Sequence, residues 1–255
     1  MLADDRLKDD PTADDPTPQP SITPLAAGVW TCLPSRTISL RLLLAALAVA
    51  LCGLALIGVD RPISAALRQW HLPGDLAKAI NLSEVFGHSL GVAAILLSVL
   101  LLAPGRRPTV WAAIVITLAS GLAANALKSC FVRVRPHSAD LIRVADPGEY
   151  QVVRGAAGPR LPDGRELVPV RLTDSRQRSF PSGHAATAWG LALGLSFVFP
   201  RGVLLFACFA SLASLQRITS GAHFPTDVLA GAAIAFTVTA LLLPLSPIKK
   251  RLSQP

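Results

Sequence analysis

The chain has 255 residues, of which 51% are apolar and only 16% are charged, with a mean hydropathy of +0.49. The apolar residues are gathered in blocks of roughly fifteen to twenty, which excludes an ordinary soluble domain and predicts membrane spans. In a membrane chain the net charge of +8 favours an anionic lipid or substrate over nucleic acid. The four cysteines lack CxxC spacing and predict packing thiols rather than a disulfide framework.

The first 35 residues are rich in Asp, Pro and Thr and show no helical or strand periodicity, which predicts a disordered N-terminal tail. Residues 1–24 hold six Asp against Arg6 and Lys8, a net charge of −4. The first apolar run begins too late, and behind too acidic a segment, for a cleaved signal peptide. We therefore expect a retained first span.

Six apolar runs without charged residues follow the tail, and each predicts a helix. They cover residues 42–59, 86–103, 109–127, 185–200, 202–216 and 228–248. The fourth and fifth would give only about 22 to 24 Å of helix against a hydrocarbon core of roughly 30 Å. We expect these two to continue into their polar flanks rather than to form a re-entrant hairpin. Residues 36–248 are thus predicted to be an all-α, six-helix membrane domain, followed by a short basic tail at 249–255.

Basic residues near the ends of the runs predict the orientation of the chain. With six spans, one side holds Arg36, Arg41, Arg106, Arg107, Arg201, Lys249, Lys250 and Arg251. The positive-inside rule makes this side cytoplasmic. The other side also holds basic residues, ten of them between Lys128 and Arg178, but long loops obey the rule poorly. Loop 137–178 is then extracytoplasmic, and the alternation at 150–154 and 166–172 around a Pro-Asp-Gly turn signal predicts a small hairpin in it.

The first polar motif follows the third run. Lys128 and Arg135 are seven residues apart, so on a helix that continues to Pro136 they would project from nearly the same face. Two snorkelling cations at a membrane boundary are the simpler alternative.

The second polar motif is Pro181-Ser182-Gly183-His184, directly before the fourth run. Ser182 is a good N-cap, and Gly183 lets the backbone approach a ligand closely. The free amides at a helix start attract an anion, and His184 would place a proton donor in the first turn. An ordinary helix N-terminus is the alternative.

The third polar motif, Arg217, His223 and Asp227, joins the fifth and sixth runs. Pro225 suits the start of the next helix, so the carboxylate of Asp227 can fold back onto one imidazole nitrogen of His223 and leave the other free. An Asp at the edge of a membrane span is costly unless it is paired, which argues against a structural accident.

The predicted topology brings all three motifs to the outer face. Three cations, a helix start, two histidines and one orienting carboxylate are the groups needed to bind a tetrahedral oxyanion and transfer it to an imidazole. The basic remainder of the chain offers only scattered carboxylates, and the sequence has no Gly-rich Walker loop. We therefore expect neither a metal nor a nucleotide cofactor.

Together the motifs Lys-x6-Arg-Pro, Pro-Ser-Gly-His and Arg-x5-His-x3-Asp resemble the signatures of the PAP2 superfamily, the type 2 phosphatidic acid phosphatases. The resemblance covers roughly residues 80–245, and Gln216 stands where the family usually has Ser. It implies a six-helix bundle in the cell membrane with an extracytoplasmic site. It also implies a lipid phosphate substrate, no cofactor and no nucleic acid partner, and it leaves the oligomeric state open.

The resemblance further implies a role for each motif residue. Lys128, Arg135, Ser182, Gly183 and Arg217 would hold the phosphoryl oxygens. His223 would attack phosphorus to form a phosphohistidine, and Asp227 would fix its tautomer. His184 would protonate the leaving alkoxide and then activate water.

Three functional hypotheses follow. The first is a lipid phosphate phosphatase acting on phosphatidate, phosphatidylglycerol phosphate, a polyprenyl diphosphate or phosphorylated lipid A. The second is a vanadium-dependent haloperoxidase, because the site of the same superfamily can hold vanadate. The haloperoxidases of that superfamily are soluble proteins, however, and the apolar runs argue against this hypothesis. The third is a lipid phosphate binding or transport protein without turnover.

Overall fold

The protein is described as a computed structural model that covers residues 35–70, 73–131, 133, 135, 136, 140–143, 150–154, 166–168 and 178–245. The predicted N-terminal tail up to residue 34, the basic tail at 249–255 and most of loop 137–178 lie outside the described residues.

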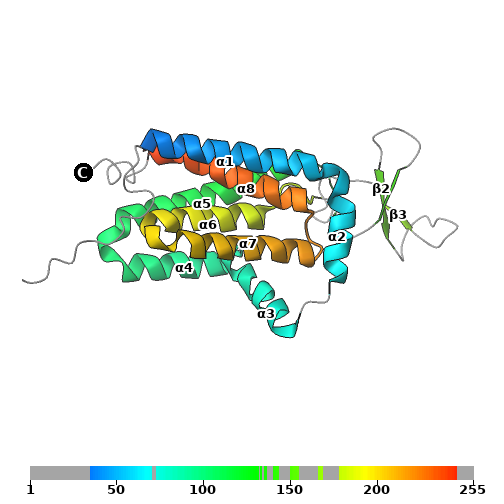
Figure 1. Ribbon diagram of the computed structural model, residues 1–255, viewed down its shortest axis with the longest axis horizontal. Coiled ribbons are helices and arrows are strands. Elements are labelled where there is room, and N and C mark those ends of the chain that lie inside the picture. The colour runs from blue at the N-terminus through cyan, green and yellow to red at the C-terminus, as the bar shows by residue number, and fades with distance from the viewer. Residues whose placement is uncertain are drawn as a thin grey trace, which may run out of the picture.

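Six long helices run along the long axis of the molecule (Figure 1). They are α1 (Ser35–Leu56), α4 (Ser89–Leu102), α5 (Arg107–Lys128), α6 (Gly183–Val198), α7 (Val203–Thr219) and α8 (Pro225–Leu242). Each overlaps one of the six apolar runs, which confirms the predicted helices. As expected, α6 and α7 take in polar flanking residues at the end where they meet the motifs.

Shorter elements connect these helices. Two short helices, α2 (Asp60–Gln69) and α3 (Gly74–Leu82), were not predicted, and α2 lies across one end of the bundle (Figure 1). The described 3-10 turns are Ile57–Val59, Ser83–Phe86, Pro104–Arg106, Pro200–Gly202 and Leu243–Leu245. Beyond α2 lie the antiparallel strands β1 (Asp140–Arg143), β2 (Tyr150–Arg154) and β3 (Glu166–Val168), in that order. β2 pairs with β3 where the sequence predicts a hairpin, and β1 is an additional strand.

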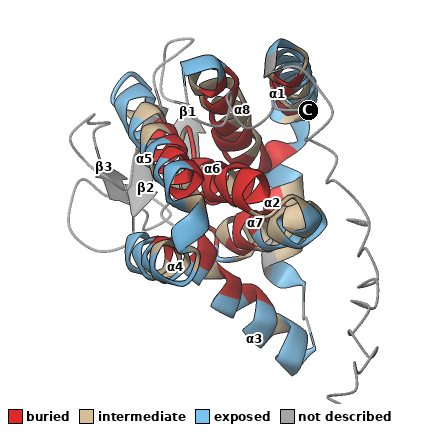
Figure 2. Cartoon of the chain, turned by 90° about the vertical axis from the view of Figure 1, so that its left-hand side faces the viewer, coloured by how far each residue is buried: buried red, intermediate tan, exposed pale blue. Residues whose placement is uncertain are grey.

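Helix α6 lies at the centre of the bundle, enclosed by α5, α7 and α8 (Figure 2). Twelve of its sixteen residues are buried. Gly190 and Gly194 face α5, where a Cβ on either would lie only 2.8 Å from Ser120 Oγ and from Ala113 Cβ, respectively. Small residues four apart let the backbones of α5 and α6 come close, which is a common way to pack helices in a membrane.

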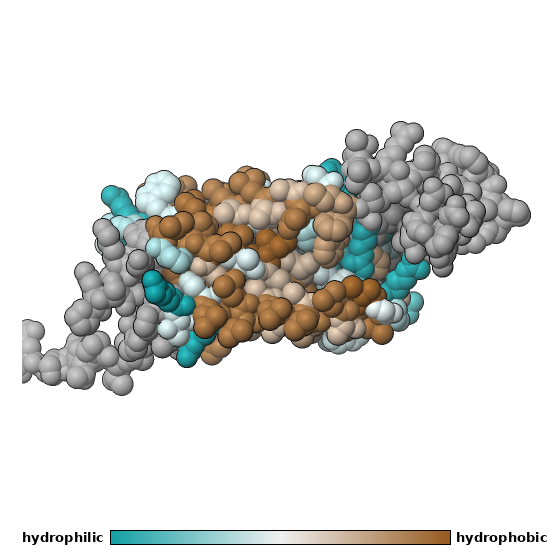
Figure 3. Space-filling model, turned by 90° about the horizontal axis from the view of Figure 1, so that it is seen from above, coloured by the Kyte–Doolittle hydropathy of each residue, from teal (hydrophilic) through white to brown (hydrophobic). Residues whose placement is uncertain are grey.

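The outer surface of the bundle is apolar. Large side chains on α1, α4, α5 and α7 are exposed, among them Leu47, Leu97, Leu118 and Leu204. Figure 3 shows the resulting brown belt, with hydrophilic residues at both ends. A surface of this kind is stable in a bilayer rather than in water. The chain is therefore a membrane protein.

The helices differ in whether they are long enough to span a membrane. Four helical segments are long and apolar enough to cross a membrane, namely Arg36–Leu67, Pro104–Lys128, Pro200–Thr219 and Pro225–Leu245. The pair Gly74–Phe86 and Ser89–Leu102, bent by 70°, would add a fifth. The remaining helix, α6, has 16 residues and is shorter than these four segments.

Candidate active site

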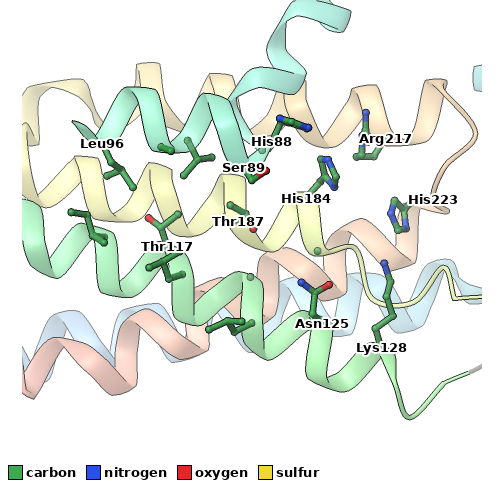
Figure 4. Close-up of a pocket in the computed structure, with 18 of the residues that line it drawn as sticks. His88, Ser89, Leu96, Thr117, Asn125, Lys128, His184, Thr187, Arg217 and His223 are labelled. Atoms are coloured by element: carbon green, nitrogen blue, oxygen red, sulfur yellow. The ribbon is translucent and has the colours of Figure 1, made fainter. Parts of the chain in front are cut away.

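A cavity of about 700 Å³ opens at the end of the bundle where α5 ends and α6 begins. Its polar end is lined by Lys128, Arg135, His184, Arg217 and His223, five of the eight site residues predicted from sequence. Gly183 lines it as well. In Figure 4 the side chains of His184, His223, Lys128 and Arg217 converge from three helices and one loop. The structure thus brings the three motifs together.

The first motif reaches the cavity by a route that differs from the prediction. Helix α5 ends at Lys128, not at Pro136, because turn hydrogen bonds from Ser129 and Cys130 close its last turn. The chain then extends, and the carbonyl of Arg133 accepts the N–H of Ser179 at 2.7 Å. This pairing with a distant segment replaces the helical ladder. The expectation that Lys128 and Arg135 share one helix face is therefore wrong, although both line the same cavity.

Arg135 lies close to another cation, and one N–H donor of its own side chain is unpaired among the described residues. Burial and the nearby charge of Arg217 lower the pKa of its guanidinium. Its Nε–H is buried and has no hydrogen-bond partner among the described residues. Buried polar groups are rarely left unpaired, so this donor indicates a place for an anion.

The second motif forms the start of α6, as predicted. Ser182 is the N-cap residue, and its hydroxyl accepts the N–H of Ala185 at 3.3 Å. Ser182 is fully buried and does not line the cavity, so this hydroxyl is engaged in capping. Gly183 does line the cavity, and a Cβ there would lie 3.0 Å from the Oδ1 of Asn125. The glycine keeps the helix start open to a ligand.

The third motif places a buried carboxylate behind a buried imidazole. His223 is 2% exposed and Asp227 is fully buried, and Nδ1 of His223 lies 3.7 Å from Oδ2 of Asp227. Asp227 stands in the first turn of α8, which begins at Pro225 as predicted. Burial lowers the pKa of His223, and the Asp227 carboxylate opposes that shift only in part. The imidazole is therefore neutral near pH 7, with the nitrogen away from Asp227 available as a nucleophile.

Two residues that hold Asp227 were missed by the sequence reasoning. The Oδ2 atom accepts the N–H of Phe224 at 2.8 Å and the hydroxyl of Ser179, whereas Oδ1 accepts from Nη1 of Arg133 at 2.5 Å. Ser179 lies just before the second motif, and Arg133 occupies one of the unspecified positions of the first. Arg133 could have been suspected, because a third cation between Lys128 and Arg135 exceeds what snorkelling at one helix end requires.

Arg217 is held from two sides at the cavity wall. Its Nε donates to Oε1 of Gln216 at 2.5 Å, and its Nη2 forms an ion pair with Oε1 of Glu84 at 2.6 Å. Gln216 also donates to Glu84 at 3.4 Å. The glutamine that departs from the family pattern thus helps to orient the arginine. Glu84 precedes α4 and was not predicted.

The cavity continues from this cluster into an apolar groove between α4 and α5. Leu96, Leu97 and Leu100 line it from α4, and Ile114, Leu118 and Leu122 line it from α5. Figure 4 shows the groove running from His223 towards Leu96 and Thr117. Leu97, Leu118 and Leu122 in this lining are each more than half exposed, so the groove is not enclosed by the bundle.

A model of the PAP2 superfamily matches residues 109–251, more than half of the chain. The chain belongs to the PAP2 superfamily. This confirms the resemblance seen in the three motifs, all of which fall within the matched residues. Glu84 and the groove residues of α4 lie before the matched segment.

Curated relatives of this PAP2 chain include two lipid phosphate phosphatases. Lipid A 1-phosphatase of Rhizobium johnstonii is 35% identical over 79 residues, which cover 27% of this chain and 32% of that protein. Decaprenylphosphoryl-5-phosphoribose phosphatase of Mycobacterium tuberculosis is 38% identical over 77 residues, covering 29% and 41%, respectively. The matched part therefore spans less than half the length of these relatives.

Two solved structures share the fold. LpxE of Aquifex aeolicus aligns with a TM-score of 0.51 at 20% identity, covering 73% of this chain and 95% of that one. A transmembrane PAP2 type phosphatidylglycerolphosphate phosphatase from Bacillus subtilis aligns with a TM-score of 0.52 at 20% identity, covering 81% and 94%.

The residues suited to metal ligation are dispersed in the described part of this PAP2 chain. No group of three or more His, Cys, Asp or Glu side chains is placed to hold a metal ion among the residues that the structure describes. Asp227 is occupied by Arg133, Ser179 and the backbone of Phe224. The absence of a metal cofactor stays a prediction.

Proposed function

We propose that the protein is a membrane phosphohydrolase that removes phosphate from a lipid through a phosphohistidine at His223, without a metal ion. The observation that carries the proposal is the two-part cavity. A cationic end with two histidines opens directly into an apolar groove between α4 and α5. A phosphate on a hydrocarbon chain matches both parts, whereas a soluble phosphate would leave the groove empty.

The cationic end has the donors that a phosphoryl group requires. Lys128, Arg135 and Arg217 line it, and the free Nε–H of Arg135 and the start of α6 at Gly183 add further N–H donors. A phosphoryl transition state needs charge neutralisation and in-line positioning more than covalent assistance. Ser182 contributes by capping α6 and so fixing the direction of these amides.

The two histidines divide the chemistry. Nε2 of neutral His223 attacks phosphorus while the proton on Nδ1 faces Asp227, and the P–O bond to the lipid breaks. His184 takes up a proton when the anionic phosphate binds beside it and donates that proton to the leaving alkoxide. Neutral His184 then takes a proton from water, whose oxygen attacks the phosphohistidine to release inorganic phosphate and restore His223.

The substrates named for the relatives belong to one chemical class. The named relatives act on lipid A and on a decaprenyl-linked ribose phosphate, and a structural neighbour acts on phosphatidylglycerolphosphate. Phosphate esters of lipids are common to all three. We propose a phosphomonoester or diphosphate of such a lipid as the substrate.

We also propose that six helices cross the cell membrane with the site on the extracytoplasmic side. Helix α6 begins beside the site, and at its other end the carbonyl of Val198 accepts from Nη1 of Arg106, which precedes α5. It thus runs between the same two ends of the bundle as α5. Three basic residues at the far end of the bundle then lie in the cytoplasm, namely Arg106, Arg107 and Arg201.

The orientation can be tested by thiol labelling in intact cells. Cys130 is exposed at the site end, and Gly105 at the opposite end has open space where a Cβ would stand. A membrane-impermeant maleimide should label a single-cysteine protein that keeps Cys130 and spare one that carries G105C alone. Labelling of G105C but not Cys130 would reverse the proposed topology.

The activity can be tested on a panel of lipid monophosphates and diphosphates in detergent with EDTA. We expect phosphate release from at least one of them by the wild type and none above background by H223A. Retained turnover in H223A contradicts the phosphohistidine mechanism. Halide oxidation after addition of vanadate, or lipid binding without turnover over hours, would support the haloperoxidase or the binding protein instead.

A groove substitution tests the choice of a lipid over a soluble phosphate. Leu97 lines the groove, whereas Leu101, one turn further along α4, is exposed and does not line it. L97W should lower the ratio of kcat/KM for the lipid to kcat/KM for an aryl phosphate by about tenfold. L101W is the matched control and should keep the wild-type ratio. Equal ratios in all three proteins would argue against the groove.

A further inference from the structure

Arg133 is not one of the residues that define the three motifs, yet its guanidinium is the centre of a polar network. Nη1 donates to Oδ1 of Asp227 at 2.5 Å and to Oγ1 of Thr226 at 2.6 Å. Nη2 forms an ion pair with Asp60. The guanidinium lies over the ring of Phe224, 4.3 Å from its centroid. The stacking and the two ion pairs hold the planar fork in one orientation, with one prong towards each carboxylate.

Asp60 is the first residue of α2 and is 1% exposed. Its Oδ1 accepts the N–H of Thr226 at 3.1 Å, and its Oδ2 accepts from the Thr226 hydroxyl and from Arg133. A buried carboxylate is tolerated only when it is paired and hydrogen-bonded in this way. Asp60 therefore fastens both Arg133 and the first turn of α8, on which Asp227 stands. It lies outside the segment that the family model matches.

We propose that Arg133, held by Asp60, is a positioning residue that orients the carboxylate of Asp227 behind His223 and offsets its charge. This inference rests on the proposed function, in which His223 is the nucleophile. Neither Arg133 nor Asp60 is among the residues that line the cavity. Both therefore act on the reaction through Asp227 and not on the substrate.

The network influences how the pair of His223 and Asp227 binds a proton. The charged groups that face His223 are Asp227, Lys128 and Arg135, and His184 lies across the cavity. Loss of the Arg133 cation makes the His223–Asp227 pair bind a proton more tightly, wherever in the pair that proton resides. Loss of the Asp60 anion has the opposite effect, because Arg133 then carries an unbalanced charge.

The test compares R133M, R133K and D60N in the full-length protein, with an aryl phosphate and with a lipid phosphate. We expect R133M to lower kcat by about 10- to 100-fold while KM changes less than about threefold, because the substrate contacts remain. The acid limb of kcat/KM should move to higher pH in R133M and to lower pH in D60N. R133K keeps the positive charge but loses the planar guanidinium. Its acid limb of kcat/KM should therefore stay near the wild-type position, and its kcat should fall less than that of R133M.

If the contacts of Arg133 and Asp60 only held α2 against α8, their loss would lower the amount of folded protein. It would not shift the acid limbs of kcat/KM in opposite directions in R133M and D60N. Thermal unfolding in detergent reports folding, and if R133M does not fold, R133K and D60N still give the kcat and pH readouts. Unshifted limbs, or a kcat within twofold of the wild type, overturn the inference. If H223A is active, the proposed function fails first. If H223A is inactive and the Arg133 and Asp60 variants behave as wild type, only this inference fails.

Discussion

The two histidines to which the proposed function assigns the chemistry lie in different surroundings. His223 is 2% exposed and is backed by Asp227, which is itself held by an arginine, a serine and a backbone amide. His184 stands on the cavity wall, where the ring of the exposed His88 lies 6.2 Å from its own and where Glu84 pairs with Arg217. The contrast matches the two tasks. A nucleophile benefits from a fixed geometry, whereas an acid and base must reach both the leaving group and water.

The two proposed roles are tested most directly by removing each imidazole and changing the leaving group. H223A should lose about 10⁴-fold or more of kcat with lipid and aryl phosphates alike, because no covalent intermediate can form. H184A should lose about 10²- to 10⁴-fold with a lipid alkyl phosphate, which needs a proton on its leaving oxygen. With an aryl phosphate, H184A should release up to one equivalent of phenol in a burst and then turn over slowly.

The burst is measured by rapid mixing at enzyme concentrations comparable to the product detected. The slow phase should coincide with an acid-labile phosphoenzyme, which is the signature of phosphohistidine. A burst in H223A, or its absence in H184A when the first step remains fast, would mean that the two roles are assigned wrongly.

The open side can be probed at the Glu84–Arg217 pair, with a smaller expected effect. The Glu84 side chain is 37% exposed, so its charge is partly screened. E84Q removes a negative charge near the bound oxyanion, while Gln216 still orients Arg217. We expect inorganic phosphate to inhibit E84Q about two- to fivefold more strongly than the wild type. E84D keeps the charge and is the control; weaker inhibition of E84Q would show that Glu84 mainly positions Arg217.

The smallest expected effect is a shift in pH dependence on the buried side. Because burial lowers the pKa of His223, the neutral imidazole persists to a pH below 6.5, and activity is lost only as the pH falls through that lowered value. The charges of Lys128 and Arg135 also lower this pKa. K128M should therefore move the acid limb of kcat/KM upward by about half a pH unit or more. Both proteins are measured with the same aryl phosphate, so its ionisation cancels; an unchanged limb would show that Lys128 does not act on His223.

Apolar runs and motif spacing predicted much of this architecture. The six long helices follow the six apolar runs. A bilayer requires continuous apolar helices, and such segments can be recognised directly in the sequence. The grouping of His184, Arg217 and His223 at one end was predicted from the order of the apolar runs, and the shared cavity confirms it. The helix continuing to Pro136 was predicted wrongly, because the backbone of Arg133 pairs with Ser179, far along the chain.

Asp60 shows what sequence reasoning overlooked. It directly follows the first apolar run, and an acidic residue at the edge of a span is costly unless it is paired. The same argument singled out Asp227 and would have flagged Asp60 as well. The identity of its partner was beyond reach, because Arg133 is 73 residues away and no fixed spacing joins them.

Hydropathy and helical spacing are local properties, so they were enough to predict a helical membrane protein with its three polar motifs on one face. The surroundings of each motif depend instead on how the chain folds. It closed α5 at Lys128, stacked Arg133 on Phe224 and directed its fork to Asp60 and Asp227. It also opened the cavity into an apolar groove between α4 and α5. Such contacts join residues far apart along the chain, and they depend on how helices pack rather than on any pattern within one segment.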